Sequence, residues 1–96
     1  MKYTPVSVDE ARATASLNDW TIIDSTIVRE FRLGSFSAIA DFVTLVISAS
    51  ERLNHHPDLD IRYPDRVTVR LTTHAIRGLS TLDVQLADEI AGFARN

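Results

Sequence analysis

The chain has 96 residues, a net charge of −3, 45% apolar residues and 24% charged residues, values typical of one small globular domain spanning residues 1–96. The acidic balance without a basic stripe gives no support for nucleic-acid binding, the lack of cysteine excludes disulfides and thiolate metal sites, and no stretch is typical of a signal peptide or membrane span. We therefore expect a cytoplasmic protein without a membrane partner, whose modest core would gain further burial from a homo-oligomer interface.

The first third of the chain predicts a helix followed by a β-hairpin. Ser7 and Glu10 form a capping-box pattern, in which each side chain bonds the backbone N–H of the other residue, and the helix should end near Asn18. The runs 21–24 (TIID) and 26–33 (TIVREFRL) are rich in β-branched and aromatic residues and are separated by a short turn. That spacing is typical of a hairpin. The second run carries three apolar side chains on one face: Ile27, Phe31 and Leu33.

Residues 35–54 predict the longest helix, and Gly34 and Ser35 mark its start. The apolar residues recur with the three- and four-residue spacing of a single buried stripe. The members of this predicted stripe are Phe36, Ile39, Ala40, Val43, Val46, Ile47 and Leu53. Because Pro57 disfavours helical geometry at His56, the helix should end at or just before the adjacent histidines.

The last third predicts a second hairpin and a final helix. Residues 59–63 and 66–74 alternate between two faces and are joined by a turn at Pro64. In the second of these strands one face carries Val67, Val69, Leu71 and Thr73. The final helix opens at Ser80 with a second capping box, completed by Asp83. Its apolar stripe consists of Leu86, Ala87, Ile90 and Phe93.

The element order is therefore α-β-β-α-β-β-α. Strands joined by hairpins are antiparallel, and helices with one apolar stripe each must pack on one face of the sheet. We expect an α+β fold with two layers, in which three helices cover one face of a four-stranded antiparallel sheet. The other sheet face and the edges are left for a second copy or for a site.

Two of the three histidines, His55 and His56, are adjacent at the end of the longest helix. Taken alone, they are most simply interpreted as a solvated helix end. However, Glu51 lies four residues before His55, one helical turn away, where a carboxylate can orient an imidazole. Pro57 fixes the direction in which the chain leaves the pair. His74, at the end of a predicted strand, is a candidate third member of a site.

Two further interpretations stay open at this point. Asp83 is explained by helix capping alone, by a role in the site, or by both together. A metal centre is the other alternative, since catalytic zinc takes three protein ligands and keeps one position open. Adjacent histidines at a helix end seldom face the same ion, and the chain has no helical HxxxH pair, so we expect no metal.

The segments E-R-L-N-H-H-P-D-L-D-I-R-Y, V-T-V-R-L-T-T-H and G-L-S-T-L-D-V-Q-L-A resemble the pterin-4a-carbinolamine dehydratase family. The resemblance is dense over residues 51–90 and extends more loosely over the rest of the chain. It implies a four-stranded antiparallel sheet with three helices on one side, assembled as a homodimer or homotetramer. It also implies dehydration of 4a-hydroxytetrahydropterin to quinonoid dihydropterin, without a metal or organic cofactor. This reaction regenerates the cofactor of aromatic amino-acid hydroxylases, which makes such a hydroxylase a candidate partner.

Position by position, the resemblance assigns His55, His56 and His74 to the site, with Glu51 and Asp83 as its acidic residues. We hypothesise that His55 and His74 share the roles of general acid and general base, each worth about 10²–10⁴-fold in rate. In this hypothesis His56 binds and orients the pterin, and Glu51 orients His55. Sequence alone leaves open which histidine is the acid.

Two positions depart from the family pattern. Leu59 stands where many members have tryptophan, which removes an expected aromatic wall beside the pterin. Ala75 stands where an acidic residue is frequent, next to His74. A non-catalytic alternative also follows from the resemblance, because animal relatives serve as a dimerisation cofactor for a homeodomain transcription factor. The chain could then be a protein-binding module with a vestigial site.

Overall fold

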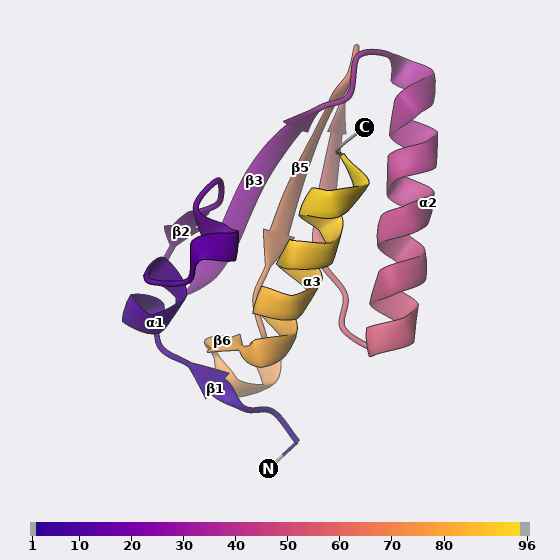
Figure 1. Cartoon of the computed structure of the whole chain (residues 1–96). Helices are drawn as coiled ribbons and strands as arrows, with labels where there is room; N and C mark the ends of the chain where they lie inside the picture. Colours follow the sequence, from indigo (N-terminus) through magenta and orange to yellow (C-terminus); the bar gives the residue numbers. More distant parts are fainter. Residues whose placement is uncertain (1, 95–96) are drawn as a thin grey trace.

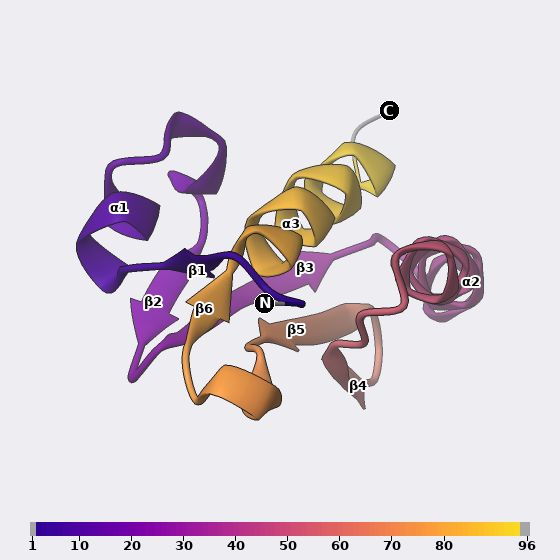
Figure 2. The ribbon, with the colours of Figure 1, turned by 90° about the horizontal axis from the view of Figure 1, so that it is seen from below.

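The computed structural model of the protein describes residues 2–94 and contains the predicted two-layer α+β arrangement (Figure 1). The four-stranded antiparallel sheet has the order β2-β3-β5-β4. Its strands are β2 (Thr21–Ile23), β3 (Thr26–Arg32), β4 (Asp58–Arg62) and β5 (Arg66–Leu71). The helices are α1 (Val8–Arg12), α2 (Phe36–Leu53) and α3 (Thr81–Phe93). Viewed along the sheet, all three helices lie on the same side of it, as expected (Figure 2).

The core fills the space between the inner sheet face and the helices. The predicted faces of both central strands are confirmed, because Ile27, Phe31, Val67, Val69 and Leu71 are buried. Helix α3 buries Leu86, Ala87 and Ile90 against them, as its predicted stripe requires. On β3, Arg29 shares this inner face, and its guanidinium lies 4.4 Å from the centroid of the Phe31 ring. This cation–π contact lets a charged residue occupy an inward position of the strand.

The N-terminal helix is shorter than predicted. The capping box of Ser7 and Glu10 is present, with two backbone-to-side-chain hydrogen bonds of 3.0 Å. These bonds from Ser7 hold the pKa of Glu10 below its ordinary value. The cap therefore stabilises the folded protein at pH values above the ordinary pKa, and this stability is lost as pH falls through the lowered pKa. Helix α1 ends at Arg12 because Thr14 is extended, and the chain continues as the 3-10 helix η1 (Ala15–Leu17) instead of reaching Asn18.

A second, two-stranded sheet was not predicted. Strand β1 (Pro5–Val6) pairs antiparallel with β6 (Leu79–Ser80), immediately before α3. The backbone N–H of Thr81 extends the contact by donating to the carbonyl of Thr4 over 3.0 Å. These bonds fix the N-terminal segment beside the start of α3, at the end of the molecule where Figure 1 places β1 and β6.

The predicted stripe of α2 is partly wrong. Its buried residues are Ile39, Phe42, Val46, Ala49 and Ser50, whereas Phe36, Ala40 and Ile47 of the predicted stripe are exposed. Phe36 and Ile47 lie on the helix face next to the core stripe. Phe36 contacts Tyr63 just after β4, with ring centroids 5.7 Å apart. We refer to Phe36, Ile47, Ile61 and Tyr63, all of them exposed, as the exposed apolar surface.

A membrane-spanning helix needs about 20 consecutive, predominantly apolar residues. Helix α2 is the longest, with 18 residues. None of the helices within residues 2–94 is both long and apolar enough to cross a bilayer.

Candidate active site

Asn54 ends helix α2 and determines where the adjacent histidines point. Its backbone is left-handed, with φ 50° and ψ 44°, a conformation that asparagine adopts more readily than most residues. The N–H of His55 then donates to the carbonyl of Ser50 over 3.0 Å. Pro57 follows the pair and leads directly into β4. The helix therefore stops one residue before the histidines, as predicted, and the reversal at Asn54 sends His55 inward and leaves His56 exposed.

Glu51 pairs with His56 and not with His55, which corrects the predicted contact. Its Oε2 atom lies 2.5 Å from His56 Nε2, and both side chains are exposed. The prediction used the four-residue spacing of a continuous helix, but the left-handed turn at Asn54 interrupts that spacing. Glu51 is therefore placed to orient His56, the ring expected to contact the pterin.

Asp83 holds the imidazole of His55, which is the role that was predicted for Glu51. Asp83 is fully buried, His55 is only 7% exposed, and Asp83 Oδ1 lies 2.6 Å from His55 Nε2. The other carboxylate oxygen, Oδ2, accepts from Thr73 Oγ1 over 2.6 Å and from the Ser80 backbone N–H over 2.9 Å. The Ser80 bond is the predicted capping interaction of α3. Asp83 therefore both caps the helix and fixes the imidazole of His55.

His74 was predicted to lie at the end of the strand, but it follows β5 in a short turn. Strand β5 ends at Leu71, and His74 opens the 3-10 helix η2 (His74–Ile76). A backbone bond of 2.9 Å from Thr73 to Gly78 closes the turn at its base. The exposed His74 side chain is thus held next to Thr73, one residue from the Asp83 network.

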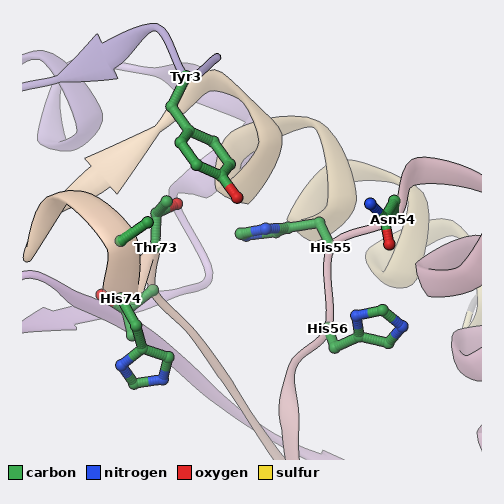
Figure 3. A pocket seen from close by; sticks show the side chains of 8 residues that line it. Tyr3, Asn54, His55, His56, Thr73 and His74 are labelled. Atoms are coloured by element: carbon green, nitrogen blue, oxygen red, sulfur yellow. The ribbon is translucent and has the colours of Figure 1, made fainter. Parts of the chain in front are cut away.

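All three histidines line one open cleft of about 230 Å³. Its lining residues are Tyr3, Asn54, His55, His56, Thr72, Thr73, His74 and Ala75. Figure 3 shows Thr73 and His74 on one side of the cleft and His55 and His56 on the other. The ring of His55 extends toward the opposite wall, while His56 turns toward the helix end (Figure 3). Segments two strands apart in sequence therefore meet at this cleft.

The hydrogen bond to Asp83 determines the tautomer of His55. An ionised carboxylate only accepts hydrogen bonds, so a neutral His55 beside it carries its proton on Nε2. Nδ1 is then the ring nitrogen whose lone pair can accept a proton. A positive charge formed on the ring is stabilised by the buried carboxylate. This arrangement suits a general base.

Three predicted positions lie outside the cleft lining, and several lining residues were missed, among them Tyr3 and Thr73. Asp83 stands behind His55 and Glu51 beside His56, whereas Pro57 only connects α2 to β4. Tyr3 and Thr73 were not proposed from sequence, although Thr73 was placed on the buried face of its strand, where a hydroxyl needs a partner. Within residues 2–94 no group of three or more His, Asp or Glu side chains is arranged to hold a metal ion.

The comparisons with known proteins agree with the resemblance. Residues 4–93 match the family model described as pterin 4 alpha carbinolamine dehydratase. The chain belongs to this family. A relative from Chloroflexus aurantiacus, named "Putative pterin-4-alpha-carbinolamine dehydratase", is 47% identical over 85 residues, which cover 85% of this chain and 90% of the relative. A protein of the same name from Nocardia farcinica is 43% identical over 94 residues, covering 96% and 98%.

Solved structures show the same fold. A transcriptional coactivator/pterin dehydratase from Brucella melitensis superposes with a TM-score of 0.85 at 28% identity, covering 96% of this chain and all of the other. A pterin dehydratase-like protein described as a RuBisCO assembly factor of the alpha-carboxysome superposes with a TM-score of 0.64 at 16% identity, covering 78% and 86%. At that identity the second likeness concerns the fold alone.

Proposed function

We propose that the protein dehydrates 4a-hydroxytetrahydropterin to quinonoid dihydropterin, in recycling of the tetrahydropterin cofactor. The observation that carries this proposal is the bond between His55 and the fully buried Asp83, at a cleft that His56 and His74 also line. Imidazoles accept and donate protons near neutral pH, so this cleft can both remove and supply a proton. In this proposal the reaction uses no metal or organic cofactor, and pterin is the substrate.

The proposed step uses one histidine on each side of the cleft. His55 Nδ1 takes the proton from ring nitrogen N5, and the electron pair left on N5 forms the N5=C4a double bond. The bond from C4a to oxygen breaks, and the leaving hydroxyl takes a proton from His74 to depart as water. His55 gains one proton and His74 loses one. Because His74 is exposed, it regains its proton from solvent before the next turnover. His56, held by Glu51, orients the pterin ring.

A coupled assay tests this function. An aromatic amino-acid hydroxylase generates the 4a-hydroxytetrahydropterin, and absorbance follows its conversion to quinonoid dihydropterin. We expect the purified protein to accelerate dehydration well above the spontaneous rate, and its rate to be unchanged after dialysis against a chelator. The metal content of the active protein is measured in parallel. Absence of acceleration by folded protein would favour the non-catalytic binding module, and a stoichiometric metal whose removal abolishes turnover would favour the metal-site alternative.

We propose further that the protein forms a homo-oligomer through the exposed apolar surface. Ile47 is 53% exposed, Phe36 56% and Tyr63 78%. Phe36 contacts Tyr63, and Ile47 lies on the same face of α2 as Phe36. Exposed apolar side chains on one face are typical of protein–protein contacts. The neighbouring β4 is an edge strand of the sheet, with one side of its backbone free to pair. Together these features suit a second copy better than solvent.

Replacing Ile47 with glutamate is expected to lower the oligomeric mass of the protein. The change places a charge in the exposed apolar surface without disturbing the core, because Ile47 does not belong to the buried face of α2. Light scattering after gel filtration gives the mass, and circular dichroism checks the fold. Ser48→Glu is the matched control, since it adds the same charge at the next exposed position of α2. Equal masses for the parent and both variants would contradict this interface.

A further inference from the structure

Tyr3 lines the histidine cleft although it lies far from every histidine in sequence. In Figure 3 its ring projects from the N-terminal segment toward the cleft, with its hydroxyl directed toward His55. The side chain is half-buried. The other lining residues are histidines, threonines, one asparagine and one alanine, so Tyr3 contributes the largest hydrocarbon ring among the described lining residues.

The position of Tyr3 is fixed by the backbone that follows it. Thr4 accepts the 3.0 Å hydrogen bond from Thr81, and the next two residues pair with β6 as β1. Strand β6 ends at Ser80, whose N–H binds Asp83. The same junction of β6 and α3 therefore holds the N-terminal segment on one side and the carboxylate behind His55 on the other.

Position 59, where the family resemblance predicts an aromatic wall, does not line the cleft. Leu59 is partly buried against the core and is not among the cleft lining. A planar fused ring binds best when an apolar or aromatic surface covers one of its faces, while a few polar groups fix its orientation. In this cleft the histidines and threonines supply the polar groups, and Tyr3 supplies an aromatic surface.

A cation lies over one face of the Tyr3 ring. The ammonium of Lys2 lies over the ring, 5.6 Å from its centroid. A cation held on one face helps to keep the ring in place beside the cleft.

We infer that Tyr3 is a substrate-binding residue, whose ring forms a wall of the cleft against which the planar pterin packs. The inference rests on the proposed function for the identity of the ring. Tyr3 takes no part in proton transfer. It contributes equally to binding of the substrate and of the transition state, so its loss raises Kd and KM and leaves kcat nearly unchanged.

Four variants test this inference: Tyr3→Ala, Tyr3→Leu, Tyr3→Phe and Leu45→Ala. The Kd for a stable 7,8-dihydropterin is measured by calorimetry, and KM and kcat by the coupled assay. Tyr3→Ala should raise Kd and KM about 2- to 10-fold, as expected for loss of one aromatic contact. Tyr3→Phe should stay within about twofold of the parent, because it keeps the ring. Leu45→Ala removes an exposed apolar side chain outside both the cleft and the exposed apolar surface, and should not change Kd.

The outcomes separate the inference from the proposed function. If Tyr3→Leu binds as tightly as Tyr3→Phe, bulk and not an aromatic wall is responsible, and the inference fails. It also fails if the parent turns over pterin and Tyr3→Ala leaves Kd and KM unchanged. If the parent binds dihydropterin without turnover and Tyr3→Ala weakens binding, the role of Tyr3 in binding is supported and the proposed dehydration is wrong. A parent that neither binds nor converts pterin overturns both.

Discussion

Replacement of His74 by alanine is expected to lower kcat by about 10²–10⁴-fold, the contribution of one general acid. His74 is the proposed donor of the proton to the leaving hydroxyl, and it lies on the wall of the cleft opposite His55. Its side chain is exposed, so its loss should hardly change the free energy of unfolding. The coupled dehydration assay and urea denaturation measure the two effects separately.

Two further readouts distinguish an acid from a binding residue at position 74. An acid acts only when it is protonated, so His74→Ala should lose the alkaline limb of the parent's pH–rate profile. Because the site is open to solvent, added imidazole should restore part of the lost rate. His56→Ala is the comparison, since a ring that only orients the pterin should raise KM more than it lowers kcat. If His74→Ala retained kcat within threefold of the parent, His74 would not be the acid.

The main elements could be predicted because their signals are local. Both capping boxes, the apolar spacing of α3 and the alternation of β5 are encoded within a few residues of one another. Pairing of Pro5 and Val6 with β6 could not be predicted, because a two-residue strand carries no alternation and its partner is more than 70 residues away. The stripe of α2 was only half right, since periodicity marks apolar faces without telling whether Ile47 meets the core or solvent.

The membership of the site was easier to predict than its pairings. The three histidines meet at one cleft, but the carboxylate expected to hold His55 holds His56. The four-residue rule applies only within a continuous helix, and the left-handed Asn54 interrupts it. An asparagine at the predicted helix end is itself a signal for that reversal.

Asp83→Asn is expected to reduce kcat about 100-fold or more and to lower the free energy of unfolding by about 1–3 kcal/mol. Asp83 accepts hydrogen bonds at both oxygens, from His55 on one and from Thr73 and Ser80 on the other. An amide keeps one oxygen and presents an NH₂ group in place of the second. If that group faces His55, it donates to Nε2 and moves the ring proton to Nδ1, the nitrogen that should accept the substrate proton.

The buried hydroxyl of Thr73 tests the same network from its other end. It donates to Asp83 Oδ2 and lies 2.8 Å from Ser80 Oγ. Thr73→Val removes this donor and should lower kcat in the same direction as Asp83→Asn, while Thr73→Ser keeps the hydroxyl and should restore most of the rate. A purely structural threonine would show the opposite order, because valine preserves the buried volume of the side chain better than serine does.

A control for helix capping is present at the start of α1. Glu10 accepts from the backbone N–H of Ser7 just as Asp83 accepts from that of Ser80, but Glu10 is exposed, whereas Asp83 is buried and also bonds His55. Glu10→Gln should therefore weaken a capping box without changing kcat, whereas Asp83→Asn should change both kcat and stability. If Asp83→Asn lowered only stability and left kcat within threefold, Asp83 would be a helix cap alone. The tautomer of His55 would then need another cause, and the assignment of His55 as the base would lose its main support.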